Sequence, residues 1–491
     1  MWTLILGVAV VPIYLRILGV EGYGLVGVFS ALQTVISLFD FGLGTTLNRQ
    51  LARSSGVTTE ELDVRNLTRT LEVAYWTVVF LLVALCAATA PWIARHWIHA
   101  VGLPPSRVES AVMLMGLAAA FQLPFALYGG GLLGLQQHVM FNALVVGVVT
   151  VRSAGALLVL RLVSNTVEAF FAWQACVSLG QSLLAAILLW RKLAGPRYNP
   201  RFDSRLLSKV WRFAFGVGAI AALGVLQSQI DKILVSRLLP LAELGYYALA
   251  GVFASGVYML ALPLFTTYFP RFAELAKKPD SGELRFVYHQ ACQFVSSIVL
   301  PTAAVAALFS REVMVLWTGD MVIATRVSGV ASLLIVGSAM VALGGAPGAL
   351  QLAYGWTGLG LRLTAISIVL DIPILYFAIN HYGVVGAAAA WVGLYASQMA
   401  VFVCLMHRRL LTGEGRRWLV VDVALPAISS VLLATLGRLL MPSVLQGAAL
   451  ALYLAFVSVV TLFLTVTLMP LPRRALTQVL TSRSLRALRR G

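Results

Sequence analysis

Long apolar stretches recur along the whole chain, and they constrain its fold more than any other feature of the sequence. A helix needs roughly 20 mostly apolar residues to cross the hydrocarbon core of a bilayer. Only 11% of the 491 residues are charged, whereas soluble domains carry about 25%. The sequence therefore predicts an all-α polytopic membrane protein without a sizeable soluble domain.

About fourteen apolar segments are expected to form transmembrane helices. Their approximate limits are 1–17, 24–47, 70–93, 109–134, 141–160, 168–190, 213–236, 245–269, 289–309, 328–352, 361–379, 384–406, 418–438 and 444–469. The first segment meets Arg16 early and has no basic flank before it. We therefore expect the natural start to lie upstream, or the first helix to be incomplete. No cleavable signal peptide is apparent.

The basic residues gather in alternate loops. Of the 36 Lys and Arg, 26 fall in the loops and tail that share one side, and 8 fall in the loops of the other side. Lys and Arg accumulate on the cytoplasmic side of membrane proteins. The pattern predicts that both termini are cytoplasmic, and it explains the net charge of +17 without a nucleic-acid partner.

The loops are too short for a typical membrane enzyme. The longest are about 20 residues, whereas a membrane sugar polymerase or glycosyltransferase usually carries its active site in a larger extramembrane loop or domain. No ATP-binding GxxxxGK[ST] motif is present. The four cysteines lie in apolar segments without CxxC spacing, and the histidines show no metal-ligand spacing. We therefore expect a non-enzymatic protein without a metal or other cofactor.

A weak internal repeat predicts two lobes. "LGVEGYGLVGVFSAL" follows the first segment and "LPLAELGYYALAGVFASG" follows the seventh, on the same predicted side. Parallel repeats of this kind are a transporter architecture. We expect two six-helix lobes followed by two further helices. The predicted parts are an N-lobe (1–190), a basic cytoplasmic linker (191–212), a C-lobe (213–406), the last two segments (407–469) and a basic cytoplasmic tail (470–491).

Five of the ionisable residues inside the apolar segments are candidates for function. An ionisable group at a helix centre costs about 2.5 to 3.5 kcal/mol on insertion scales, so it tends to face a cavity or a partner. Arg152 and Asp371 lie near the middle of their segments, and Asp40 lies towards an inner end. Asp231 and Lys232 lie in the outer third of segment 213–236. All five are candidate functional residues.

The segment that holds Asp231 and Lys232 also contains polar neighbours. At about 100° per residue, Gln227, Ser228, Asp231, Lys232 and Ser236 share one broad helix face. Such a face suits a water-filled cavity between the lobes. The alternative is that Lys232 extends to the outer interface with Asp231 as its local partner.

The other charged residues also have simpler interpretations. Arg152 could belong to a structural ion pair between helices. Asp40 could cap a helix or pair with Arg49. Asp371 could be a hydrogen-bond partner beside the kink at Pro373. These alternatives predict effects on stability rather than on transport.

The stretch "VPIYLRILGVEGYGLVGVFSALQTVISLFDFGLGTTLNRQLA" resembles the opening of bacterial O-antigen and exopolysaccharide flippases. That family belongs to the multidrug/oligosaccharidyl-lipid/polysaccharide exporter superfamily. The second-lobe stretch "QSQIDKILVSRLLPLAELGYYALA" is also similar to it. The matching residues of the two stretches are Pro12, Tyr14, Leu15, Leu18, Gly19, Glu21, Tyr23, Gly24, Asp40, Gly42, Arg49, Gln229, Asp231, Lys232, Gly245 and Tyr246.

The resemblance implies a transporter of the bacterial inner membrane that acts in O-antigen (lipopolysaccharide) or exopolysaccharide biosynthesis. Its substrate would be an oligosaccharide linked by diphosphate to a polyprenyl lipid, and a polysaccharide polymerase and export machinery are candidate partners. On that interpretation Arg152 and Lys232 would bind the diphosphate, and Gln227 and Ser228 would bind sugar hydroxyls.

The carboxylates have a separate expected role. Asp40, Asp231 and Asp371 would bind H⁺ or Na⁺ and couple alternating access to an ion gradient. A drug/cation antiporter of the same fold is the alternative, in which these carboxylates matter most. A membrane glycosyltransferase or polymerase is disfavoured by the short loops.

Overall fold

The computed structural model describes residues 2–54, 58–193, 200–278, 282–442, 445–474 and 477–478, and every regular element in them is helical. The first half contains α1 (Trp2–Ile36), η1 (Ser37–Asp40), α2 (Leu43–Ser54), α3 (Thr58–Trp92), η2 (Ile93–Trp97), α4 (Pro105–Gly134), α5 (His138–Leu162), α6 (Val167–Lys192), α7 (Ser204–Leu238) and α8 (Leu241–Met259). The second half contains α9 (Leu262–Leu275), α10 (Gly282–Leu308), α11 (Ser310–Thr318), α12 (Met321–Leu343), α13 (Gly345–Ala353), α14 (Thr357–Leu410), α15 (Gly415–Arg417), η3 (Trp418–Ala424), α16 (Leu425–Leu439) and α17 (Gly447–Leu468).

Glycine at position 19 reverses the chain within α1. Gly19 has φ 74° and ψ 176°, a backbone conformation that is essentially restricted to glycine. Tyr14, before the kink, packs on Phe170, and Phe29, after it, packs on the adjacent Phe171. A straight helix would separate Tyr14 from Phe29 by about 22 Å. The two halves of α1 therefore run in opposite directions, as two separate spans.

The long helix α14 is divided in the same way. Gly383 has φ 58° and ψ −142° inside the 54 residues of this element. Gly386 lies so close to Ala378 that a Cβ on Gly386 would stand 2.1 Å from the Ala378 carbonyl oxygen. The chain therefore turns back at Gly383, and the two halves of α14 correspond to the predicted segments 361–379 and 384–406.

The prediction of fourteen transmembrane helices is confirmed. Within the described residues, eleven helical stretches are long and apolar enough to cross a membrane. The kinks divide two of them, and α7 is a further helix of 35 residues. Backbone groups in lipid must be satisfied within the protein, so helices that close their own hydrogen bonds are the form these apolar stretches take.

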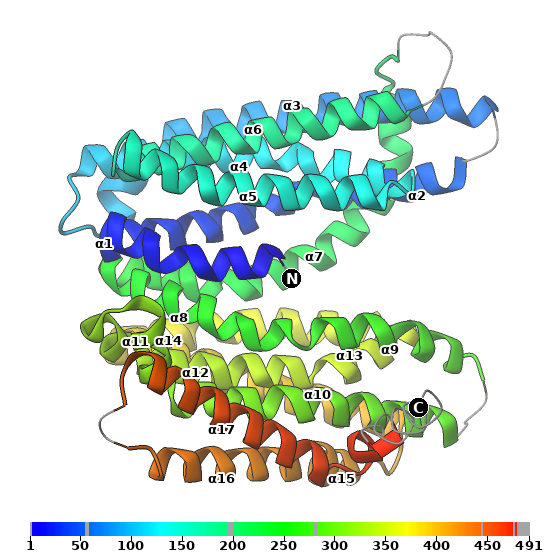
Figure 1. Cartoon of the computed structure of the whole chain (residues 1–491). Helices are drawn as coiled ribbons and strands as arrows, with labels where there is room; N and C mark the ends of the chain where they lie inside the picture. The colour runs from blue at the N-terminus through cyan, green and yellow to red at the C-terminus, as the bar shows by residue number, and fades with distance from the viewer. Residues whose placement is uncertain are drawn as a thin grey trace, which may run out of the picture. The chain divides into compact units, whose positions relative to one another are not determined.

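Residues 1–248 form one compact unit. Its centre is the pair α4 and α6, with α3 and α2 against α4 and with α5 against α6 (Figure 1). Tyr128 and Leu132 of α4 and Phe171 of α6 are almost completely buried. Gly131 allows this close packing, because a Cβ there would lie 2.6 Å from a methyl carbon of Leu189.

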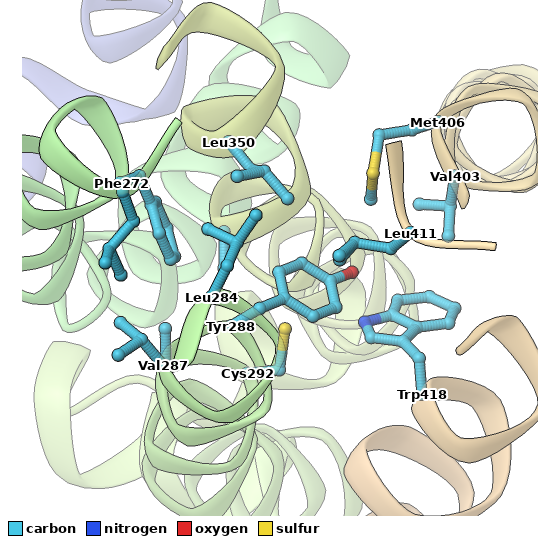
Figure 2. Packing of buried hydrophobic residues seen from close by; sticks show 13 residues of the cluster. Phe272, Leu284, Val287, Tyr288, Cys292, Leu350, Val403, Met406, Leu411 and Trp418 are labelled. Carbon is cyan, nitrogen blue, oxygen red and sulfur yellow. The ribbon is translucent and has the colours of Figure 1, made fainter. Parts of the chain in front are cut away.

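Residues 249–491, as far as they are described, form a second compact unit. Its central helix is α10, which contacts α12, α16, α17 and η3. Figure 2 shows Tyr288 and Cys292 of α10 beside Trp418 at the start of η3, with Met406 and Leu411 from the end of α14 close by. The end of α14 and the start of η3 are thus held on α10 by one apolar cluster.

The two copies of the repeat pack against each other within the first unit. A Cβ on Gly24 would stand 2.4 Å from the carbonyl oxygen of Leu241, and a Cβ on Gly245 would stand 2.4 Å from that of Val20. Small residues at both positions let the helix backbones approach closely, as in other membrane helix pairs. One glycine of each copy therefore has a packing role in this contact.

The predicted lobe boundaries stay predictions. The compact first unit extends to Ala248 and includes α7, which contacts α1, α2 and α3. The sequence placed this helix at the start of the C-lobe. Part of the predicted linker (194–199) and most of the predicted tail (475–476 and 479–491) lie outside the described residues.

Candidate functional site

Arg152 lies on α5 and points at one face of α6. Its guanidinium donates to Gln181 Oε1 at 2.9 Å, to Ser178 Oγ at 3.3 Å and to Gln174 Oε1 at 3.5 Å. These three residues recur at the helical spacing i, i+4 and i+7, so they form one stripe. The backbone oxygen of Arg152 accepts a hydrogen bond from Trp173 Nε1 at 3.2 Å. The polar stripe of α6 therefore fixes the position of the arginine.

The partners of Arg152 are all neutral. No carboxylate within the described residues forms an ion pair with it, so the structural ion pair considered above is not present there. The side chain is half-buried in a membrane-spanning helix. A cation without a paired carboxylate attracts anions strongly in such a position. Electrostatic interactions are weakened much less in the low-dielectric interior of a membrane than in water. The arrangement suits a phosphate-bearing ligand.

An apolar pocket begins next to these partners. It lies between α5 and α6, has a volume of about 570 Å³ and is lined by residues such as Val148, Val151 and Val177. Trp173 and Gln181, which both hydrogen-bond to Arg152, also line it. A cation beside an apolar pocket matches the chemistry of a lipid that carries a phosphate group.

The adjacent residues Asp231 and Lys232 have different partners in the structure. Asp231 is 4% exposed and accepts a hydrogen bond from Tyr247 Oη of α8 at 2.6 Å. Lys232 is half-buried and donates to Gln229 Oε1 at 3.3 Å. No ion pair joins Asp231 to Lys232 in the part of the chain that is described. The side chain of Asp231 is thus held by α8, and that of Lys232 is held by Gln229 of its own helix.

The predicted polar face of α7 is divided by its packing. Gln227 is 6% exposed, like the buried Asp231 on the same side of the helix. Ser228 is half-buried and donates to the backbone oxygen of Val225 at 2.8 Å. Gln227 and Asp231 therefore face protein, whereas Ser228 and Lys232 retain partial access.

Asp40 caps a helix. It ends η1, and its two carboxylate oxygens accept hydrogen bonds from the backbone N–H groups of Gly42 and Gly44, each at 3.2 Å. The hydroxyl of Tyr75 donates to the same carboxylate. These contacts satisfy the amino end of α2. Asp40 also lines a pocket of about 350 Å³ together with Gln33 and Gln122. Its carboxylate therefore caps the helix beside a cavity, and its predicted role in ion coupling stays a prediction.

Capping and ion coupling predict different results at position 40. Asparagine caps helices as well as aspartate does, whereas alanine costs about 0.5–2 kcal/mol. Because Asn keeps one of the two acceptor oxygens, we expect Asp40→Asn to lower the free energy of unfolding by less than Asp40→Ala, which should lower it by that amount. Unfolding in detergent measures both.

The matched control for Asp40 is Asp320, whose carboxylate caps α12 by accepting from Val322 N and Ile323 N. The same pair of substitutions at Asp320 should give the same pattern of unfolding free energies. Equal destabilisation by Asn and Ala at position 40 would contradict the capping role. A loss of H⁺ or Na⁺ dependence in Asp40→Asn would demonstrate the coupling role.

Asp371 is 3% exposed in the first half of α14. It belongs to the second unit, whereas the other six predicted site residues belong to the first. Arg152 is held by α6, Asp231 by α8 and Asp40 by the start of α2. The described contacts therefore place these residues in separate hydrogen-bond groups, and their joint role in transport remains a prediction.

Two polar groups were missed by the sequence interpretation. The first centres on Glu72 of α3, which is 8% exposed. Its carboxylate accepts from Tyr128 Oη at 2.7 Å and from Trp190 Nε1 at 3.2 Å, and pairs with Arg69 at 2.6 Å. Glu72 lies at the inner end of its apolar segment, two residues inside the limit drawn from hydropathy. The position of a glutamate inside an apolar segment was the sequence feature that could have identified this group.

The second missed group joins α10 to the helices after α14. His289 is completely buried, with Nδ1 against a carboxylate oxygen of Asp422 and Nε2 at 3.0 Å from Glu414 Oε2. Gln293 Nε2 donates to Asp422 Oδ1 at 2.9 Å. Both imidazole nitrogens of His289 thus face carboxylate oxygens, one from Asp422 and one from Glu414. Asp422 lies inside an apolar segment, which was the only sequence signal.

The described residues contain no group of His, Cys, Asp and Glu with a geometry that would hold a metal ion. The His289 group instead satisfies its charges internally, through Asp422, Glu414 and Arg285, whose guanidinium lies 3.8 Å from Glu414. Its chemistry is that of a structural charge network.

Comparisons with known proteins identify the family. A family model described as "Polysaccharide biosynthesis protein" matches residues 1–276, which is more than half of the chain. No curated protein sequence gives a significant match.

Several solved structures share the fold. One is the lipid II flippase MurJ in an inward closed conformation, with 10% identity, a TM-score of 0.67 and coverage of 91% of this chain and 96% of that one. Another is an inward-facing multidrug resistance MATE family transporter of the MOP superfamily, with 15% identity, a TM-score of 0.67 and coverage of 83% and 94%. A MOP superfamily transporter from Pyrococcus furiosus matches with 15% identity, a TM-score of 0.54 and coverage of 86% and 94%.

Proposed function

Because the chain belongs to the polysaccharide biosynthesis protein family, we propose that it flips polyprenyl-diphosphate-linked oligosaccharide units across the bacterial inner membrane for surface polysaccharide synthesis. The shared fold of MurJ and the MATE transporters supports a multi-pass protein that works by alternating access. The excess of Lys and Arg in alternate loops supports cytoplasmic termini.

The observation that carries the proposal is the environment of Arg152. A guanidinium with three neutral acceptors and no described carboxylate partner keeps its full charge for a ligand. Arginine forms bidentate, charge-assisted hydrogen bonds with phosphate oxygens. The apolar pocket beside Trp173 and Gln181 offers a surface for the lipid part of the same molecule. Arg152 is therefore the proposed diphosphate contact.

The remaining site residues have proposed roles that follow from their packing. Lys232 and Ser228 are half-buried and are proposed to contact the diphosphate and the sugar. Gln227, also proposed as a sugar contact, is more deeply buried. Asp231 has one carboxylate oxygen, Oδ1, that accepts no hydrogen bond from the described residues. That oxygen makes Asp231, rather than the capping residue Asp40, the preferred coupling carboxylate of the first unit. Asp371 is the proposed coupling carboxylate of the second.

Deletion of the gene in its native host tests the proposed function in cells. We expect the lipid-linked oligosaccharide to accumulate in the inner leaflet and the surface polysaccharide to disappear, with recovery when the gene is restored. An unchanged surface polysaccharide together with greater sensitivity to cationic drugs would support the antiporter and contradict the flippase.

A further inference from the structure

An apolar groove lies between the last turns of α14 and the start of η3. Its volume is about 670 Å³, within the range of about 300 to 1,000 Å³ that is usual for sites of small ligands. Met399, Val403 and Cys404 line the α14 side, and Trp418, Leu419 and Val423 line the opposite side. Little of the lining is polar, so the groove suits hydrocarbon.

One end of this groove is cationic. Arg408, in the last turn of α14, and Arg416, in α15, both line it and are both exposed. Neither arginine has an ion pair or a hydrogen bond from its side chain among the described residues. Their neighbour Arg409 stacks on Trp356, with the guanidinium carbon 4.3 Å from the ring centroid. Two arginines at the end of the groove are therefore available to an anion.

The carboxylate closest in sequence is turned away from these arginines. Glu414 is the only acidic residue in the segment 407–417. Its side chain is 15% exposed and is engaged by His289 at 3.0 Å and Arg285 at 3.8 Å. The buried network of α10 thus removes the one local counter-charge, and Arg408 and Arg416 keep a net positive charge at the end of an apolar groove.

The surface around the groove is hydrophobic. Val401, Leu405, Leu419 and Val420 are exposed by between 36% and 56%. In a membrane-spanning protein such a surface faces lipid chains, and arginines at the ends of spans lie at headgroup level. The occupant that meets both the apolar groove and the arginines is a molecule with hydrocarbon chains and an anionic head.

We propose that this groove, formed by the end of α14, the turn before α15 and the start of η3, binds one anionic phospholipid of the adjacent leaflet. Arg408 and Arg416 hold its phosphate, and an acyl chain lies between Val403 and Leu419. Under the proposed topology this is the cytoplasmic leaflet, where basic pockets between helices are known to bind acidic lipid heads. The site goes beyond the proposed transport function and does not depend on it.

Native mass spectrometry of the purified full-length chain tests this site. Phosphatidylglycerol and phosphatidylcholine are titrated separately, and retained lipid is counted. We expect one phosphatidylglycerol to bind with preference over phosphatidylcholine. The double variant Arg408→Gln/Arg416→Gln should bind it roughly thirtyfold less tightly, since each cation near an anionic head contributes about fivefold.

Two further variants separate specific binding from general charge effects. Ala400→Trp fills the groove from an exposed position while both arginines remain, and it should also weaken binding. Arg191→Gln/Lys192→Gln removes two exposed cations at the end of α6, on the same predicted side of the membrane, and should leave the affinity unchanged.

The result that would overturn the proposal is equal weakening by the α6 control and the groove variants, or equal retention of the two lipids. Unaltered binding in Ala400→Trp would also reject it, because the lipid would then be held at the surface by charge alone. The readout is lipid binding, so these outcomes are independent of whether the chain flips an oligosaccharide.

Discussion

Replacement of Arg152 with glutamine is expected to weaken binding of the lipid-linked oligosaccharide by roughly ten- to hundredfold, since a hydrogen bond to a charged group contributes about 1.5–3 kcal/mol. Arg152→Lys should recover part of this loss, because lysine keeps the charge but not the bidentate geometry. The measurement is the Kd of the purified variants for a polyprenyl-diphosphate oligosaccharide, compared with the corresponding monophosphate. The loss should be larger for the diphosphate.

A matched control distinguishes the ligand role of Arg152 from a structural one. Arg161 lies in the last turn of the same helix and is exposed, so Arg161→Gln should leave the Kd unchanged. Arg152→Gln also leaves the acceptors of Gln174 and Gln181 without their donor, which lowers stability. A variant that loses thermal stability but binds diphosphate and monophosphate lipids as the wild type does would show that Arg152 is only structural.

Replacement of Asp422 with alanine is expected to lower the free energy of unfolding by about 3–5 kcal/mol, the usual cost of leaving a buried charge without its partner. Asp422 and His289 are both completely buried, and Gln293 would lose an acceptor at the same time. Asp422→Asn keeps an acceptor for the histidine and should cost less. Unfolding of the purified chain in detergent measures each variant.

The control for Asp422 is an exposed ion pair in the same unit. Glu283 pairs with Arg271, and both side chains are more than 40% exposed, so Glu283→Ala should leave the free energy of unfolding almost unchanged. The double variant His289→Ala/Asp422→Ala should cost less than the sum of the single variants, because the residues share one interaction. A cost for Asp422→Ala that matches the Glu283 control would refute the network.

The helices could be predicted from the sequence because hydropathy and backbone chemistry act together in a membrane. A stretch of apolar residues in lipid has to satisfy its own backbone groups, and a helix does so. The backbone turns at Gly19 and Gly383 were harder to predict from the sequence, since any glycine between apolar segments permits such a conformation. The inner extension of α3 to Thr58 was missed because hydropathy marks the lipid-facing part of a helix and not its end.

The candidate site was predictable only in part. An arginine in the middle of an apolar segment is costly, which singled out Arg152, but its partners Gln174, Ser178 and Gln181 are ordinary polar residues of another helix. Asp40 was assigned two simpler interpretations, and the capping one is present in the structure. His289 was set aside because it lies near a segment end, and its partners are more than 120 residues away in the sequence.

The most direct test of the central claim is flipping by the purified chain in proteoliposomes. A polyprenyl-diphosphate oligosaccharide is placed in the outer leaflet, and its exposure to an added glycosidase is followed with time. The proposed function predicts loss of the exposed oligosaccharide in vesicles with the wild type, faster under an H⁺ or Na⁺ gradient, and little loss with Arg152→Gln. A rate equal to that of empty vesicles, in protein that exports a cationic drug from the same vesicles, would contradict it.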